Sequence, residues 1–245
     1  MNAASNGLAT ELTVAAWPGT VPRLLRTGAT GEDREDVSEY VRAGGYQAVE
    51  DPAALLDEVD RSGLLGRGGA AFPLAVKLRA VRDAGRTGRE TIVVANGEEG
   101  EPASIKDKWL LRNRPHLVLD GVRLAATIVA AKRAFVYVSD GQAARAVEEA
   151  IDARAAAGPD VEITVMSVEP GYVAGEETAA VRALNGGPAK PTDKPPRPFE
   201  HGVGGNPTLV SNVETLANLP FLLRHGADAF RSEGTSASPG TRGAR

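Results

Sequence analysis

The chain has 245 residues, of which 42% are hydrophobic and 24% are charged. This composition supports an ordinary globular core and excludes wholesale disorder, and the length corresponds to one large domain or two small ones. The 28 basic and 32 acidic residues give a net charge of −4, which argues against a nucleic-acid partner bound through a strong positive field.

The sequence contains no cysteine. Disulfides, thiolate zinc sites, catalytic cysteines and protein-ligated iron–sulfur clusters are therefore excluded within this chain. Its three histidines disfavour a multi-histidine metal site, so we expect no bound metal. No apolar run approaches the roughly 18 residues of a membrane span, and no signal-peptide pattern is evident. We expect a cytoplasmic protein and leave open a peripheral association with a membrane complex.

Apolar periodicity divides the chain into three parts. Residues 1–40 show no apolar periodicity, so we expect an irregular leader there. We expect an α/β domain over residues 41–230 and a frayed tail over residues 231–245. Predicted helices cover residues 52–62, 73–85, 115–128 and 142–156. Predicted buried strands cover residues 91–95, 134–138 and 161–168. This alternation predicts a parallel sheet with right-handed crossovers.

Two segments near the end of the domain complete this prediction. Residues 187–208 are rich in proline and glycine and predict a loop. Ser211 and Glu214 then fit a capping box, which predicts that a helix begins there.

A glycine loop over residues 66–71 matches the pattern G-x-G-x-x-A. A helix, not a strand, precedes it, so the usual dinucleotide fingerprint does not apply. Its glycines still permit close backbone approach, and Pro73 begins a helix whose free N–H groups attract anions. Arg67 and Lys77 add positive charge. The loop predicts a phosphate or pyrophosphate cradle, and a tight helix–helix connection with solvated cations explains the pattern equally well.

Acidic residues follow two of the predicted strands. Glu98, Glu99 and Glu101 lie just past the first, where ligands bind in open α/β sheets. They could bind sugar hydroxyls, a ring edge or a divalent cation, although a solvated turn is the simpler explanation of this turn alone. Glu176 and Glu177 begin a helix after the third strand, where carboxylates also complement the helix dipole.

Several motifs, in a fixed order, resemble the flavin-bearing, NADH-oxidising subunit of respiratory complex I and its relatives in NAD-linked hydrogenases and formate dehydrogenases. The first motif spans residues 62–73 and is followed by Lys77. The others span residues 96–102, 106–107, 114–116, 175–179, 194–196 and 212–217. The resemblance covers residues 41 to 241.

This resemblance implies a Rossmann-like α/β domain that holds FMN and an activity of the NADH dehydrogenase (quinone) type. The residues that would line the FMN are Gly66, Arg67, Gly68, Lys77, Asn96, Glu98, Glu99, Tyr172, Gly175, Glu176 and Glu177. The residues that would hold its phosphate are Val210, Ser211, Asn212 and Thr215. The residues that match the NADH site are Gly69, Phe72, Glu101, Glu177 and Lys194. Hydride would pass from NADH or NADPH to the flavin, and no residue need act as a nucleophile.

The sequence also departs from this family. Ala80 and Arg197 stand where members usually carry phenylalanines that stack on the adenine, and Phe72 is the aromatic residue that remains. The family continues into a β-rich domain and a four-cysteine iron–sulfur domain, which this sequence does not contain. The resemblance therefore implies a separate iron–sulfur electron-transfer partner. The alternative is an FMN-binding module, or a truncated paralogue, that does not oxidise NADH.

Overall fold

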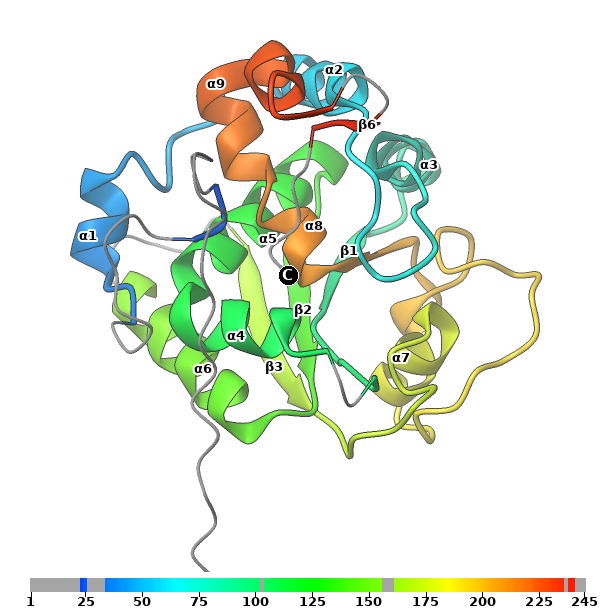
Figure 1. Ribbon diagram of the computed structural model, residues 1–245. Helices are drawn as coiled ribbons and strands as arrows, with labels where there is room; N and C mark the ends of the chain where they lie inside the picture. The colour runs from blue at the N-terminus through cyan, green and yellow to red at the C-terminus, as the bar shows by residue number, and fades with distance from the viewer. Residues whose placement is uncertain (1–22, 26–33, 102–103, 156–160, 236–237, 241–245) are drawn as a thin grey trace, which may run out of the picture.

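A computed structural model of the chain describes residues 23–25, 34–101, 104–155, 161–235 and 238–240. Its centre is a parallel sheet in the order β3-β2-β1-β4 (Figure 1). The strands are β1 (Ile92–Asn96), β2 (Arg133–Val138), β3 (Glu162–Ser167) and β4 (Thr208–Asn212). The predicted α/β class with a parallel sheet is confirmed. The fourth strand was not predicted, because its five residues follow the proline- and glycine-rich loop.

Helices surround this sheet among the described residues. They are α1 (Val37–Arg42), α2 (Pro52–Ser62), α3 (Leu74–Gly85), α4 (Lys106–Asn113), α5 (Pro115–Val129), α6 (Gly141–Ala155), α7 (Glu177–Leu184), α8 (Val213–Leu216) and α9 (Leu219–Arg231). A short 3-10 helix spans Val203–Gly205, and β5 (Gly234–Thr235) pairs with β6 (Ser238–Pro239) in a small antiparallel ribbon. No helix in the described part of the chain is long and apolar enough to cross a membrane.

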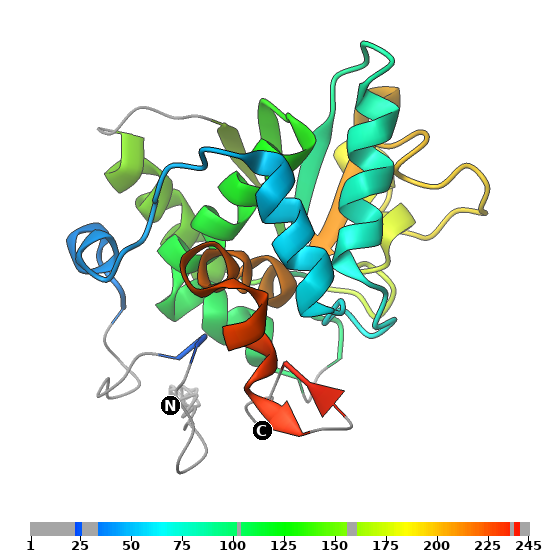
Figure 2. The same cartoon turned by 90° about the horizontal axis from the view of Figure 1, so that it is seen from above.

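The two faces of the sheet are covered unequally. Val93 and Ala95 of β1 belong to the large core that α2, α3, α5, α6 and α9 complete. Their neighbours Ile92 and Val94 point to the other face, where a smaller cluster packs against α7. Figure 2 shows α5 and α6 on one side of the sheet and α7 on the other. This burial on both faces explains why β1 is apolar without alternation.

Capping residues mark both ends of α2 at the positions predicted from the sequence. The Asp51 side chain accepts hydrogen bonds from the Ala53 and Ala54 amides at 2.8 and 3.1 Å, and Gly63 ends α2 in the left-handed region at φ 65°. The predicted bounds of this helix are confirmed. The predicted capping box is wrong by one residue: Ser211 lies within β4, and Asn212 caps α8.

The ends of the chain differ in part from the prediction. Residues 37–42 form α1, so ordered structure begins before the predicted boundary at residue 41. Residues 234–235 pair with residues 238–239, inside the segment predicted to fray. Residues 1–22, 26–33 and 241–245 lie outside the described part of the chain.

A buried polar cluster fastens α1 and the segment after it to α5. Asp120 accepts hydrogen bonds from the Tyr40 hydroxyl at 2.8 Å, the Tyr46 amide at 2.9 Å and the Arg123 guanidinium at 2.9 Å. The Tyr46 hydroxyl and His116 Nδ1 share a further hydrogen bond of 3.0 Å. His116 is only 3% exposed, and burial lowers its pKa to about 4. The imidazole is therefore neutral at pH 7.

We predict that His116 makes the fold sensitive to acid. Its pKa is lower in the folded chain than its ordinary value, so stability is complete above about pH 6.5 and falls until about pH 4. The variant His116→Asn offers the Tyr46 hydroxyl an acceptor but takes up no proton. Urea unfolding at several pH values should show that the parent loses about 3 kcal/mol more than the variant between pH 7 and 4. Parallel pH profiles would contradict this prediction.

Candidate cofactor-binding site

The strand order reverses between β1 and β4. The chain passes from β1 to β2 and β3 on one side, then returns to β4 on the opposite side of β1. Asn96 and Asn212 are the last residues of these two strands and lie opposite each other in the register. Ligands in open α/β sheets bind outside the carboxyl ends of the strands at such a reversal. The topology therefore locates the candidate site at these two asparagines.

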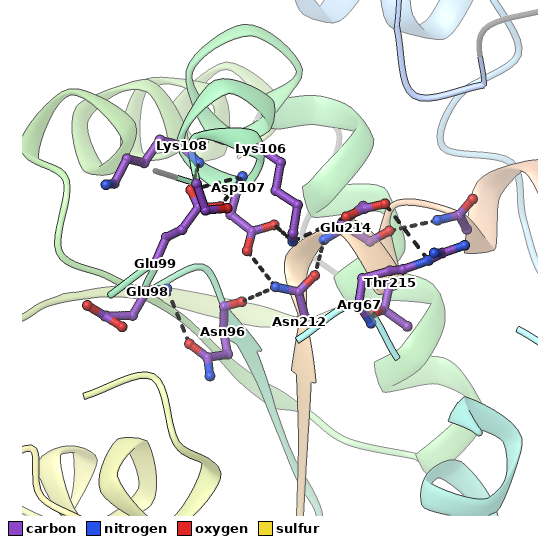
Figure 3. A network of polar contacts seen from close by, with 12 residues as sticks. Arg67, Asn96, Glu98, Glu99, Lys106, Asp107, Lys108, Asn212, Glu214 and Thr215 are labelled. Atoms are coloured by element: carbon purple, nitrogen blue, oxygen red, sulfur yellow. Dashed lines mark hydrogen bonds and ion pairs between the residues drawn. The ribbon is translucent and has the colours of Figure 1, made fainter. Parts of the chain in front are cut away.

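A network of polar side chains surrounds Asn212 at this point (Figure 3). Its Nδ2 donates to Asp107 Oδ2 at 2.6 Å and to the Asn96 carbonyl at 3.4 Å, and its Oδ1 accepts from the Glu214 amide at 3.0 Å. Lys106 Nζ lies 2.7 Å from Asp107 Oδ1 and 3.2 Å from Glu214 Oε2. Asp107 is 3% exposed, and burial raises its pKa to about 6 despite the nearby ammonium.

The glycine loop of residues 66–71 packs directly on the start of α8. The Arg67 amide donates to Thr215 Oγ1 at 2.8 Å, and a Cβ added at Gly68 would lie 3.4 Å from the Asn212 Cβ. Arg67 Nε is buried without a hydrogen-bond partner, and the Glu214 carboxylate is 3.9 Å away. The loop thus places a guanidinium with one unpartnered nitrogen near the strand reversal.

Two lysines connect the start of α7 to the rest of the site. Lys77 Nζ on α3 donates to Glu177 Oε2 at 3.0 Å and to the Val210 carbonyl of β4 at 3.1 Å. Lys194 Nζ lies 2.7 Å from Glu176 Oε1 and 2.8 Å from Glu177 Oε1. Burial acts to raise the pKa of the Glu177 carboxyl, but the two lysines outweigh it and hold that pKa below its ordinary value. Glu177 is therefore ionised at neutral pH.

Glu98 and Glu99 are adjacent in the sequence but have different surroundings. Glu99 accepts from the Asp107 and Lys108 amides at 3.2 and 3.3 Å and from the Ser104 hydroxyl, so its carboxylate caps the start of α4. Glu98 Oε1 accepts a 3.4 Å hydrogen bond from the Gly171 amide, while its Oε2 is buried without a partner. Burial raises the pKa of Glu98. Of the two, Glu98 has the oxygen that is free for a ligand.

The turn after β1 packs against the loop before α7 because glycines allow it. A Cβ added at Gly100 would lie 2.6 Å from the Gly171 carbonyl, and one added at Gly175 would lie 2.7 Å from Glu98 Oε2. Asn96 Nδ2 also donates to the Gly175 carbonyl at 2.7 Å. These contacts fix the second wall of the site against the end of β1.

The predicted site residues separate into an inner group and a rim. The inner group, linked by the contacts above, contains Arg67, Lys77, Asn96, Glu98, Gly175, Glu176, Glu177, Lys194, Val210, Asn212 and Thr215. Phe72 and Tyr172 lie on exposed loops, with 43% and 82% of their surface accessible, and Glu101 is also exposed. Ser211 is buried in β4 beside the group. Sequence reasoning included Asp107 in the motif of residues 106–107 but assigned it no role, and it did not predict α4, the helix on which Asp107 lies.

These features define a class of protein: an α/β domain with a candidate site for a nucleotide-type cofactor at a strand reversal. The unpartnered Arg67 Nε and Glu98 Oε2 are the buried polar atoms that such a ligand would satisfy. Residues 59–221 match the family model of the Nuo51 FMN-binding domain, and the chain belongs to that family.

Relatives of known name agree with this assignment. The chain is 36% identical over 218 residues to an NADH-quinone oxidoreductase subunit of Aquifex aeolicus, an alignment that covers 82% of this chain and 50% of the relative. It is 34% identical over 227 residues to the NADP-reducing hydrogenase subunit HndC of Solidesulfovibrio fructosivorans, covering 86% and 46%. The chain thus spans about half the length of the relatives that it matches.

A solved structure shows the same fold. The crystal structure of an NAD+-reducing [NiFe]-hydrogenase in the H2-reduced state aligns with a TM-score of 0.69 and 36% sequence identity. The alignment covers 78% of this chain and 34% of the hydrogenase chain. The resemblance inferred from the spaced motifs is confirmed.

We predict that Gly175→Ala weakens FMN binding about tenfold, because overpacking of about 1–3 kcal/mol displaces the Glu98 carboxylate. Gly141→Ala is the matched control, since nothing lies within 4 Å of a Cβ added there. Quenching of flavin fluorescence measures the dissociation constant of each variant. Equal affinities in the two variants would show that Glu98 and Gly175 do not shape the flavin site.

Proposed function

We propose that this chain is the flavin module of an NAD(P)H dehydrogenase: it binds FMN at the strand reversal and accepts a hydride from NADH or NADPH. The observation that carries the proposal is the packing of the glycine loop onto α8, directly over the paired strand ends Asn96 and Asn212. Membership of the FMN-binding family supports the choice of flavin.

In this proposal the side chains bind and orient, and the cofactor performs the chemistry. FMN supplies a ring that accepts a hydride from a reduced nicotinamide. Arg67 and Lys77 place positive charge beside the glycine loop, where the phosphate of the flavin needs it. Glu98, whose Oε2 is buried without a hydrogen-bond partner, would offer that oxygen to the cofactor from the wall beside Gly175. Correct placement of the two rings lowers the barrier by proximity, without a nucleophilic side chain.

The rim residues are our candidates for the nicotinamide nucleotide. Phe72 has an exposed ring on the glycine-loop side, and Glu101 is exposed on the turn after β1. Lys194 and Glu177 form the ion pair that faces them from the α7 side in this proposal. In this proposal the nicotinamide nucleotide would bind between these loops, beside the flavin.

Electrons taken up as a pair must leave for an acceptor. The sequence contains no cysteine and so provides no thiolate ligand for an iron–sulfur cluster. Two relatives are named as subunits, one of an NADH-quinone oxidoreductase and one of an NADP-reducing hydrogenase. We therefore propose an iron–sulfur partner subunit as the acceptor, in a cytoplasmic or membrane-peripheral complex.

An anaerobic titration tests the proposed function. The purified chain is incubated with FMN, freed of unbound flavin and titrated with NADH and then NADPH while the visible flavin band is recorded. We predict that a bound flavin band is retained and that at least one of the two nucleotides bleaches it. Failure to retain any flavin at micromolar protein would refute the proposal.

A second function, FMN binding without NADH oxidation, is favoured by one observation. The positions that usually carry adenine-stacking rings hold Ala80 and Arg197, and neither of these side chains is aromatic. Ala80 is half-buried on α3, and Arg197 is exposed in the loop after Lys194. A flavin band that neither nucleotide bleaches would identify this second function.

We predict that Ala80→Phe combined with Arg197→Phe raises NADH affinity about tenfold, since each aromatic contact contributes about 0.5–1.5 kcal/mol beyond its burial. Arg182→Phe is the control for the substitution at Arg197. It also replaces an exposed arginine with a ring, but at a position on α7. The NADH concentration at half-bleaching, or NADH binding by calorimetry, measures the effect. An equal gain in the control would point to nonspecific stacking.

A further inference from the structure

We propose that Asp107 is a positioning residue for the cofactor: its ionised carboxylate fixes the Asn212 amide at the strand reversal and thereby makes FMN affinity depend on pH. This inference rests on the proposed function.

The contacts of Asn212 leave its amide one acceptable orientation. Its Oδ1 accepts from the Glu214 amide, and its Nδ2 donates to Asp107 Oδ2 and to the Asn96 carbonyl. If the amide flipped, its N–H groups would face the Glu214 N–H, and the Glu214 donor would have no acceptor. An ionised Asp107 only accepts hydrogen bonds and so adds a second constraint against the flip, whereas a protonated Asp107 can donate and removes that constraint.

The orientation of Asn212 matters because its amide lies at the strand reversal, where the cofactor would bind. Gly68 approaches the Asn212 side chain, and the Arg67 amide holds Thr215, three residues further along. Asn212 therefore lies directly beside the loop that lines the proposed cofactor site. Asp107 acts through Asn212, and no contact of its own with the cofactor is required.

The charges that face Asp107 come from each element packed around it. Lys106 on the same helix lies 2.7 Å away, and Glu99, from the turn before α4, accepts from the Asp107 amide. Glu214 on α8 shares the Lys106 ammonium, and Arg67 lies beyond Glu214 at 3.9 Å. Burial raises the pKa of Asp107 to about 6, against the opposing effect of Lys106. The carboxylate is thus ionised at pH 7.5 and mostly protonated at pH 5.

The test compares FMN dissociation constants from pH 5 to 8 in the complete chain and three variants. FMN itself titrates at about pH 6 through its phosphate, but this contribution is common to all four proteins. Asp107→Asn keeps the shape of the side chain and removes its charge. Asp140→Asn is the matched control, since Asp140 follows β2 at the same edge of the sheet and caps the Ala143 amide.

We expect Asp107→Asn to bind FMN about tenfold more weakly than the parent at pH 7.5, because a charge-assisted hydrogen bond is lost. At pH 5 the two affinities should converge, since the parent carboxyl is then neutral as well. The control should keep the parent profile. A ratio of affinities that stays constant from pH 5 to 8 would assign Asp107 a merely structural role and overturn the proposal.

Lys106→Gln provides a second, independent measurement. Its ammonium lowers the pKa of Asp107, so its removal should move the midpoint of the pH profile to a higher pH. An unmoved midpoint overturns the proposal even where Asp107→Asn does not fold. If no variant and no parent protein binds FMN at any pH, the proposed function itself fails, whereas binding with no pH difference among the proteins refutes only the role of Asp107.

Discussion

The site depends on one pairing, that of β1 with β4. Because Asn96 and Asn212 end adjacent parallel strands, every segment that follows or covers them converges on one small volume. The turn after β1, the start of α8, the glycine loop and the start of α7 are far apart in the sequence, yet each contacts one of these two asparagines or its neighbours. The side-chain bonds of Asn212 to Asp107 and of Lys106 to Glu214 then tie the segments after the two strands together.

Shared cations keep this crowded acidic volume stable. Lys106 lies between Asp107 and Glu214, and Lys194 lies between Glu176 and Glu177. Each of these four carboxylates thus has a cationic partner that offsets part of its desolvation cost. A cation shared by two carboxylates leaves the pair with net negative charge. Lys77 adds a second cation at Glu177, and Arg67 lies 3.9 Å from Glu214.

Local sequence rules recovered the elements that follow simple periodic or capping patterns. The Asp51-Pro52 start and Gly63 end of α2 are of this kind, and so are the apolar runs of β1, β2 and β3. The strand β4 was missed because its five residues follow a long irregular loop, and the capping signal at Ser211 suggested a helix. That signal was off by one residue, since Asn212 offers an equally good cap.

The sequence indicated which residues belong to the candidate site, but it did not indicate what each of them contacts. Spaced motifs predicted Arg67, Lys77 and Glu177 as one set. In the structure Lys77 bonds to Glu177, while Arg67 bonds through its amide to Thr215. The sequence could not distinguish Glu98 from Glu99, because the difference arises from a helix, α4, that begins seven residues beyond Glu99. Long-range hydrogen bonds of this kind leave no local pattern.

The unequal covering of the sheet has a consequence for local unfolding. The face that α7 covers has a small apolar cluster, while the opposite face carries the main core. Sub-global opening should therefore detach α7 and its flanking loops first, and their amide protons should exchange with solvent earlier than those of α5. The wall that carries Glu176 and Glu177 can then loosen by itself, at a free-energy cost well below that of global unfolding.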